Sequence, residues 1–304
     1  MRISLVTPAG PGLRNGNRHT ALRWAAFLRA AGHKVSVSTE DTSSGADAML
    51  ALHARRIHAS IKSFSSSGNL VVALTGTDIY RDIRSSAEAR ESLELADRLI
   101  VLQPKAIEEL APRHRKKARV VVQSSATRLR QDPVHGKFRI CVIGHLRAEK
   151  DPLRTLASLG FLKDQDLEVV HIGALLDPAL RPDKADPRYR WLGGVPHARA
   201  LRWLASSHAM VISSRMEGGA NVVCEALRIG VPVLASRISG NLGLLGAGYS
   251  GYFPLENERA LARLINRISR EKSFYRTLKR QIARLRPMVE PRSEARALLA
   301  ALRP

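Results

Sequence analysis

The sequence predicts an α/β protein built from two Rossmann-like, doubly wound domains. The chain has 304 residues, which is more than one ordinary hydrophobic core accommodates. Residues 3–38 read as a strand, a turn-rich loop, a helix and a second strand, the usual opening of a Rossmann-like half. A polar, irregular linker at 124–137 precedes a new apolar strand at 138–143. We therefore expect an N-terminal domain over 1–130 and a C-terminal domain over 131–288.

The first half carries short apolar runs that alternate with loops and helical stretches. Its first helix is expected at 19–31 and ends before Gly32, a residue type that takes the left-handed conformation of a helix end at no steric cost. A second helix is expected at 104–110. The expected strands cover 3–6, 34–38, 48–52, 70–74, 96–102 and 120–122.

The second half contains an apolar helical run at 221–229 with a clear end. Gly230 suits the position that follows a helix, and Pro232 prevents the helix from continuing. The small-residue stretch N-L-G-L-L-G at 241–246 is expected to be a loop. The expected strands cover 138–143, 167–172, 209–212 and 231–235.

The charge balance is strongly basic. Lys and Arg number 49 against 27 Asp and Glu, which gives a net charge of +22 and a pI near 11.1. Such a field attracts nucleotides, phosphates, nucleic acids and anionic lipids without choosing among them. Aromatic residues make up only 5% of the chain and do not interleave with a basic stripe, so a base-stacking platform is not indicated. We expect no nucleic-acid partner.

The apolar pattern and the cysteines indicate in which cellular compartment the protein is expected. No apolar run approaches the length of a membrane span. The first eight residues read as a strand and a turn rather than as a signal peptide. Cys141 and Cys224 are far apart and lie in apolar runs, so we expect buried, reduced thiols. These features predict a cytoplasmic protein with no stable membrane association.

Residues 213–236 carry the strongest motif, S-S-R-M-E-G-G-A-N-V-V-C-E-A-L-R-I-G-V-P-V-L-A-S. Glu217 and Glu225 are separated by a Gly-Gly-Ala spacer and the start of the helical run. Small residues let a polar ligand approach the backbone, the helix N-terminus suits a diphosphate, and two carboxylates can accept hydrogen bonds from polyols. The motif predicts a sugar-nucleotide site, and the alternative is an ordinary pair of surface glutamates. The donor-binding candidates here are Gly218, Gly219, Ala220, Asn221, Val222 and Glu225.

A second group of candidates follows the strands of the first half. Ligands collect at the carboxyl ends of strands in an open parallel sheet, and polar residues follow three expected strands. A solvated turn, a pair of solvated arginines at a helix start and a helix-capping role for Asp78 are the alternatives. The acceptor-binding candidates are Asn15, Asn17, Arg18, His53, Arg55, Thr75, Gly76, Thr77 and Asp78.

Several segments resemble the retaining family 4 glycosyltransferases of GT-B fold. The stretch 217–225 matches their E-x7-E motif, and G-V-P-V-L-A-S at 230–236 is also similar. The segment G-H-L-R-A-E-K-D-P at 144–152 resembles their diphosphate-binding G-R-L-x-x-E-K-G. Here His145 stands where the family has Arg, with Arg147 two residues on. The turn T-G-T-D at 75–78 resembles their H-G-x-D but lacks the His.

This resemblance implies two Rossmann-like domains that face each other across a cleft, with a last helix within 289–304 that crosses back to the first domain. It implies that Glu217 contacts the donor sugar and Glu225 the ribose. Lys150 falls on the family's phosphate lysine. Glu217, Lys150 and Arg147 are thus the implied catalytic residues, while His145 and Gly12 join the donor site.

Six segments narrow the resemblance to the bacterial Se-glycosyltransferases, the selenosugar synthases of selenoneine biosynthesis. They are P-A-G-P-G-L-R-N-G-N-R, A-L-H-A-R-R, L-T-G-T-D-I-Y-R-D, G-H-L-R-A-E-K-D-P, W-L-G-G-V-P-H-A-R-A and S-R-M-E-G-G-A-N-V-V-C-E-A. The resemblance implies UDP-N-acetylglucosamine or UDP-glucose as donor, selenophosphate as acceptor, and a 1-seleno-sugar and UDP as products. Selenium in selenophosphate is already anionic, so it needs positioning and charge compensation rather than a base. Arg18, His53 and Arg55 would supply that compensation.

The sequence implies neither a cofactor nor a metal, because no D-x-D pair lies in a loop suited to a divalent ion. Two other functions remain open. One is a family 4 enzyme with a lipid or carbohydrate hydroxyl as acceptor, and the other is a non-catalytic binder of sugar nucleotides or nucleic acid. The preferred hexose, the stereochemical outcome and the oligomeric state are also open.

Overall fold

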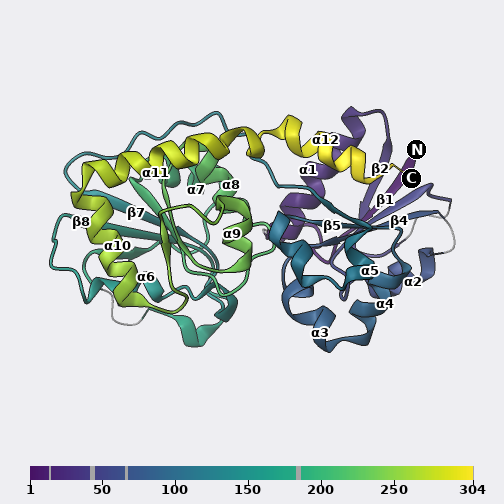
Figure 1. Ribbon diagram of the computed structural model, residues 1–304, viewed down its shortest axis with the longest axis horizontal. Helices are drawn as coiled ribbons and strands as arrows, with labels where there is room; N and C mark the ends of the chain where they lie inside the picture. The colour runs from purple at the N-terminus through teal and green to yellow at the C-terminus, as the bar shows by residue number, and fades with distance from the viewer. Residues whose placement is uncertain (14, 42–44, 66–67, 183–185, 304) are drawn as a thin grey trace. The chain divides into compact units, whose positions relative to one another are not determined.

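The computed structural model describes residues 1–13, 15–41, 45–65, 68–182 and 186–303 (Figure 1). The chain divides into two compact units. Unit 1 comprises Met1–Gln123 together with Pro291–Pro304, and unit 2 comprises Ser124–Glu290. The expected domain limits at 130 and 288 remain a prediction.

Unit 1 is a six-stranded parallel sheet in the order β2-β1-β3-β4-β5-β6. In the register of its central strands, Ile3 lies between Val35 and Ala48. The strands are β1 Arg2–Val6, β2 Lys34–Ser38, β3 Ala48–Leu52, β4 Asn69–Leu74, β5 Arg98–Val101 and β6 Ala118–Val120. The helical segments are α1 Gly16–Ala30, α2 His58–Phe64, η1 Asp78–Asp82, α3 Ile83–Ser85, α4 Ala87–Leu95, η2 Pro104–Glu109, α5 Pro112–Arg115 and α12 Pro291–Ala301.

Alternate residues of these strands enter two separate cores, as expected for a sheet covered on both faces. One core joins Leu5, Leu50 and Val71 to α1 and α12, with Trp24 and Leu298 fully buried. The other core packs the opposite face of the sheet against α2, α4 and η2. Figure 1 shows α1 and α12 on one side of the sheet and α3, α4 and α5 on the other.

Two expectations for unit 1 need correction. The first helix begins at Gly16 rather than at 19, because the Asn15 side chain accepts a hydrogen bond from Arg18 N at 3.0 Å and caps it. The segment expected to be a helix at 104–110 is a 3₁₀ segment with Pro104 in its first turn. Pro112 follows closely, so the short segment cannot lengthen into an α-helix.

Unit 2 is a second six-stranded parallel sheet, in the order β12-β11-β10-β7-β8-β9. Counted along the chain from β7, this is the 3-2-1-4-5-6 order of the Rossmann fold. The strands are β7 Phe138–Ile143, β8 Leu167–Ile172, β9 Tyr189–Trp191, β10 Ala209–Ile212, β11 Val233–Ser236 and β12 Tyr252–Phe253. The helical segments are η3 Ala148–Lys150, α6 Arg154–Leu159, η4 Pro178–Leu180, α7 His197–Ala205, α8 Asn221–Ile229, α9 Ser239–Leu245, α10 Glu258–Arg270, α11 Lys272–Leu285 and η5 Arg286–Val289.

The predicted fold class is confirmed, since both units are parallel-sheet, Rossmann-like α/β structures. In unit 2, α8 ends at Gly230 as expected, with a φ of 96°. The strand expected at 231–235 starts at Val233, because Val231 N still bonds to Ala226 O at 2.9 Å. The loop expected at 241–246 is wrong: most of it belongs to α9, since Asn241 is fully buried and its side-chain nitrogen donates to Ser236 O at 2.9 Å.

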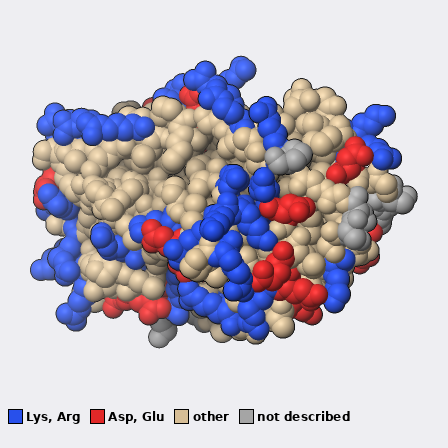
Figure 2. Space-filling view, turned by 45° about the vertical axis from the view of Figure 1, so that its right-hand side comes forward, with Lys and Arg blue, Asp and Glu red and all other residues tan. Residues whose placement is uncertain are grey.

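Figure 2 shows Lys and Arg side chains spread over the face in view, with Asp and Glu in smaller groups among them. Among the residues that the structure describes, no helix has both the length and the apolar character that crossing a bilayer requires. Cys141 and Cys224 are buried as predicted, and burial raises the pKa of the Cys141 thiol to about 12.

Candidate functional site

The order of the strands in unit 2 marks one edge of its sheet as a ligand site. The chain runs from β7 outward to β8 on one side and returns to β10 on the other, and ligands bind beyond the carboxyl ends of strands at such a switch point. Lys150 lies in the segment that follows β7, and Glu217 lies in the segment that follows β10. Residues that are distant in sequence are therefore brought to one place by the topology.

Lys150 and Glu217 form a direct ion pair. The Lys150 Nζ donates to Glu217 Oε1 at 2.6 Å, with 24% and 7% of the two side chains exposed. Ser214 Oγ donates to the same carboxylate oxygen at 2.6 Å. Two donors consequently hold this mostly buried carboxylate in place. A charge-assisted hydrogen bond is stronger here than at an open surface.

Hydrogen bonds to backbone carbonyl groups join the two loops that carry this pair. Arg215 N donates to Glu149 O at 2.9 Å, and Ser213 Oγ donates to Asp151 O at 2.8 Å. Asp151 has a left-handed backbone, with a φ of 43°. Non-glycine residues keep this costly conformation only where the surroundings impose it, often at functional sites. The hydrogen bonds between the two loops thus hold the backbone that carries Lys150 and Glu217 in place.

The amino end of α8 points its first backbone N–H groups toward the same segment. Gly218, Gly219 and Ala220 are buried immediately before it, and Ala220 is left-handed with a φ of 30°. No side chain caps the helix at Ala220, and its first turn carries no acidic residue. Asn221 and Val222 are half-buried in that turn. An N-terminus of this kind favours an anion through its N–H groups and its dipole.

Two further candidates lie after β7. The Arg147 Nε is buried and makes no hydrogen bond to the described residues. His145 is half-buried, and its Nδ1 accepts a hydrogen bond from Ala174 N at 3.1 Å. The Arg147 guanidinium therefore has donor capacity that the protein itself does not use.

Glu225 has a partner that the sequence did not reveal. The Nε2 of His197 lies 2.7 Å from Glu225 Oε1, with 50% and 14% of the side chains exposed. His197 is the first residue of α7, which packs against α8. The two carboxylates of the motif thus each contact a basic side chain, Lys150 for Glu217 and His197 for Glu225.

Sequence reasoning also missed the support beneath Glu217. A Cβ on Gly240 would lie 2.1 Å from Glu217 O, so only glycine fits there. Ser236 Oγ donates to Ser214 O at 2.7 Å, and the Asn241 side chain donates to Ser236. A glycine four residues after an apolar strand was a usable signal for Gly240, whereas nothing in the spacing indicates the role of Ser236.

In unit 1 the corresponding switch point lies between β1 and β3. The loop after β1 leads to Gly12, which is exposed with a φ of 86°, and to Asn15, whose side chain caps α1. Asn17 and Arg18 are half-buried in the first turn of α1. Arg14 of the same loop is outside the described residues. Gly12 was expected in the donor site and lies in unit 1, whereas the other donor candidates lie in unit 2.

The loop after β3 begins with a buried, left-handed histidine. His53 has a φ of 100° and is 2% exposed. Its Nδ1 accepts a hydrogen bond from Arg56 N at 3.3 Å, so the neutral ring carries its proton on Nε2, which lies 3.2 Å from Thr77 Oγ1. Burial lowers the pKa of His53 first, and Asp78 partly opposes this shift. Burial thus favours the neutral form of the ring, whose Nε2 faces Thr77 Oγ1.

Two carboxylates surround His53. Asp82 Oδ2 lies 3.8 Å from His53 Nε2 and 3.2 Å from Arg55 Nε. Asp78 is fully buried and accepts backbone hydrogen bonds from Thr75, Gly76, Ile79 and Ala54. The Asp78 carboxylate therefore shapes the loop, while half-buried Thr75, Gly76 and Thr77 form its surface. That Asp78 also contacts an acceptor stays a prediction.

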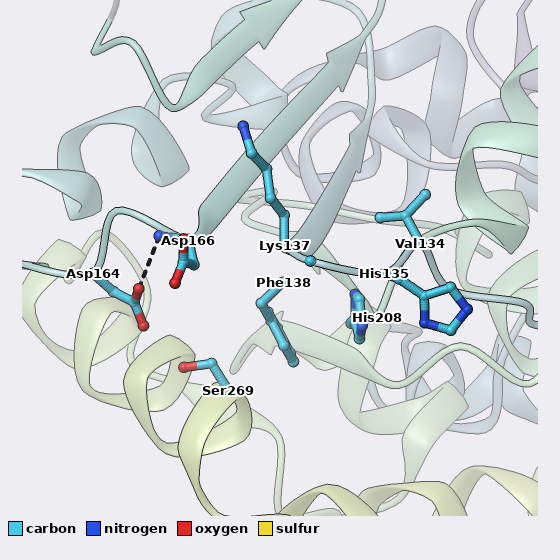
Figure 3. A pocket seen from close by; sticks show the side chains of 9 residues that line it. Val134, His135, Lys137, Phe138, Asp164, Asp166, His208 and Ser269 are labelled. Atoms are coloured by element: carbon cyan, nitrogen blue, oxygen red, sulfur yellow. Dashed lines mark hydrogen bonds between the residues drawn. The ribbon is translucent and has the colours of Figure 1, made fainter.

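A hollow of about 360 Å³ lies elsewhere on unit 2. Phe138, His208, Lys137, Asp166 and Ser269 line it together with four other residues (Figure 3). Phe138 is the first residue of β7 and Asp166 precedes β8, so the hollow lies at the amino ends of these strands. Ligands in such sheets bind at the carboxyl ends, and we do not assign this hollow to the site of Lys150 and Glu217.

In the described parts of the chain, no group of three or more His, Cys, Asp or Glu side chains is arranged to hold a metal ion. The absence of a metal requirement stays a prediction, since a substrate diphosphate can supply ligands of its own.

Comparisons with solved structures agree with this architecture. Sucrose-phosphate synthase from Thermosynechococcus elongatus is 16% identical, with a TM-score of 0.79 and coverage of 99% of both chains. HepE from Anabaena, solved with UDP and glucose, is 14% identical, with a TM-score of 0.77 and the same coverage. A glycosyltransferase from Rickettsia africae is 14% identical, with a TM-score of 0.70 and coverage of 98% of this chain and 97% of the other. At such identities the likeness shows the fold.

No curated protein sequence matches the chain. A family model described as glycosyl transferases group 1 matches residues 124–284, which include the strands, the Lys150 loop and the α8 motif of unit 2. Because this match covers more than half of the sequence, the protein belongs to the glycosyl transferases group 1 family.

Proposed function

We propose that the protein transfers a hexose from a UDP-sugar to the selenium atom of selenophosphate. The single observation that carries the donor half is the Lys150–Glu217 pair at 2.6 Å, next to the uncapped amino end of α8. A cation and a helix N-terminus suit a diphosphate, and a held carboxylate suits sugar hydroxyls. HepE of the same fold was solved with UDP and with UDP-glucose, which favours a uridine nucleotide.

The proposed step forms one bond and breaks one. A selenium lone pair forms the bond to the anomeric carbon, and the electron pair of the carbon–oxygen bond leaves with UDP. Lys150, Arg147 and the N–H groups at the start of α8 face the charge that develops on the diphosphate, the kind of stabilisation that contributes most to catalysis. Water then hydrolyses the selenium–phosphorus bond, which releases phosphate and leaves the 1-seleno-sugar.

The acceptor assignment rests on the resemblance of six segments and on one feature of unit 1. Both ring nitrogens of His53 have protein partners, Arg56 N and Thr77 Oγ1, and the ring is buried. The Asp78 oxygens already accept backbone N–H groups. Neither residue is placed to deprotonate a hydroxyl. An acceptor that is already anionic needs no base, and Arg18 and Arg55 at this edge offer positive charge.

The direct test is mass spectrometry of one reaction. The purified protein is mixed with UDP-N-acetylglucosamine or UDP-glucose and fresh selenophosphate, without added metal, and the products are searched for a seleno-sugar with the selenium isotope pattern. K150M, which removes the Lys150 charge, serves as the matched control. A seleno-sugar formed with stoichiometric UDP by the wild type supports the proposal.

Two results would count against parts of it. Binding of UDP-sugar without any selenium product would overturn the acceptor and leave a hydroxyl acceptor as the leading function. No binding of UDP or UDP-sugar by calorimetry would overturn the donor site as well.

A further inference from the structure

Three arginines gather at the carboxyl end of α8, the end opposite the proposed donor site. Arg228 lies in the last turn of α8, and Arg286 begins η5, which packs against α8. Arg130 precedes Gln131, whose backbone N donates to Ile229 O at 3.1 Å. Three separate segments of unit 2 thus bring a guanidinium group to one helix end. Since α8 has nine residues, its two ends are about 13 Å apart.

Among the described residues, the carboxylate that opposes these arginines is that of Glu290. Glu290 Oε1 lies 3.6 Å from the Arg228 guanidinium, a long ion pair. Burial lowers the pKa of Arg286, the charges of Arg130 and Arg228 lower it further, and Glu290 opposes them. Lys279 is also close, because Arg286 lowers its pKa in addition to burial. Among the described charges that act on Arg286, two are arginines and one is a carboxylate.

Part of the donor capacity of this cluster is unused by the protein. The Nε–H groups of Arg228 and Arg286 are buried and make no hydrogen bond to the described residues. A buried donor without a partner costs free energy, and like charges held together add to that cost. An anion that accepts from these groups removes both costs at once.

The carboxyl end of a helix normally repels an anion, because its carbonyl oxygens carry partial negative charge. Here two oxygens at this end of the chain segment already accept from other donors. Lys279 Nζ donates to Gly230 O at 2.6 Å, and Gln131 N covers Ile229 O. These two oxygens therefore do not need the arginines as donors.

We propose that Arg130, Arg228 and Arg286 form a binding site for a phosphate-bearing anion, distinct from the donor site at the other end of α8. Planar guanidinium groups bind phosphate oxygens in pairs, and more than one is needed to match a doubly charged group. Ser125 N donates to Val289 O at 3.2 Å, so the segments that carry Arg130 and Arg286 are adjacent. The bound anion links both segments to α8. This site does not depend on which sugar or acceptor the enzyme uses.

Calorimetry with pyrophosphate, at constant ionic strength and with the full chain, tests the site. Wild type should bind pyrophosphate at a site whose affinity falls about tenfold in R130Q and about a hundredfold in R228Q/R286Q, since each loses one or two charge-assisted contacts. The control R263Q/R276Q removes two exposed arginines from α10 and α11 and should bind as wild type does. Circular dichroism checks folding, and R130Q, at an exposed position, decides the result where the double variant does not fold.

K150Q separates this site from the donor site. Pyrophosphate binding that survives in K150Q but is lost in R228Q/R286Q supports the proposal. Binding lost only in K150Q, or unchanged within threefold in both arginine variants, overturns it.

Vesicles that contain phosphatidic acid identify the source of the phosphate. Vesicle binding that is tighter than pyrophosphate binding and is lost in the same variants assigns a lipid headgroup, whereas tighter pyrophosphate binding assigns a soluble anion. If wild type binds neither, the site does not exist.

Discussion

Replacing Lys150 by methionine tests the proposed donor site most sharply. Methionine keeps most of the side-chain length but removes the ammonium group that lies 2.6 Å from Glu217 Oε1. In the proposed reaction this group faces the leaving diphosphate, so its loss acts on the transition state. Removal of one preorganised donor from such a site typically lowers kcat by 10² to 10³, or about 3–4 kcal/mol. We therefore expect kcat/KM for the UDP-sugar to fall by roughly this factor.

The same substitution should have a smaller effect on stability. Removing one partner of a fully buried ion pair costs about 3–5 kcal/mol. Lys150 is 24% exposed, and Glu217 keeps its hydrogen bond from Ser214 Oγ at 2.6 Å. We thus expect the free energy of unfolding to fall by only about 1–2 kcal/mol, between the surface and buried limits. The protein stays folded at the assay temperature, and the kinetic loss is then a property of the site.

The assay is the initial rate of UDP release over a range of UDP-sugar concentrations, with urea unfolding measured on the same preparations. K150R, which keeps a positive charge on a differently shaped group, should recover part of the lost rate. A K150M enzyme whose kcat/KM lies within threefold of wild type would refute the assignment. An equal loss of UDP affinity and of kcat/KM would instead show that Lys150 acts on the bound ground state.

Three other substitutions test the framework of the two units. Burial lowers the pKa of His171 to about 4 from 6.5, so the unfolded chain binds a proton that the folded protein excludes. Stability should therefore fall by about 1.4 kcal/mol per unit as the pH drops from 6.5 toward 4, and urea unfolding of H171Q should show a shallower slope; equal slopes would contradict this reasoning. A Cβ in G240A would lie 2.1 Å from Glu217 O, so we expect a loss of about 1–3 kcal/mol and reduced UDP release, whereas G248A, with open space at that position, should match wild type. Glu294 accepts three hydrogen bonds from Arg23 and Trp24 of α1 and is 1% exposed, so E294A should lower the free energy of unfolding by about 2–4 kcal/mol. A change below about 0.5 kcal/mol in urea unfolding would show that this contact does not stabilise unit 1.

The sequence was sufficient for the fold class because the signals involved are local. Each strand is a short apolar run, and turn-forming residues separate it from the next helix. Gly230 predicted the end of α8 through its own backbone preference, and the structure gives it a φ of 96°. The 3₁₀ segment at Pro104–Glu109 and the helix at Ser239–Leu245 were missed. In the second, the glycine content indicates a loop, and the burial of Asn241 against the sheet favours the helix instead.

The pairing of Lys150 with Glu217 marks the limit of spacing arguments. The two residues are 67 positions apart, and nothing in the sequence of either segment predicts a contact with the other. They meet because β7 and β10 are neighbours in the sheet, which is a consequence of topology. The resemblance to a known motif implied that each residue contacts the donor, Lys150 at the diphosphate and Glu217 at the sugar, but only the strand order shows why one loop should contact the other. His197, 28 positions from Glu225, was missed for the same reason.

These pairings change the physical meaning of the E-x7-E motif in this chain. Two carboxylates that face solvent would bind polyols weakly, because water competes for the same hydrogen bonds. Here Glu217 and Glu225 each contact a basic side chain and are mostly buried, with 7% and 14% of their side chains exposed. A carboxylate held in this way pays less conformational entropy when a sugar or ribose hydroxyl donates to it. In the proposed donor site, the basic partners rather than the spacing of the glutamates would therefore prepare the two carboxylates for a sugar nucleotide.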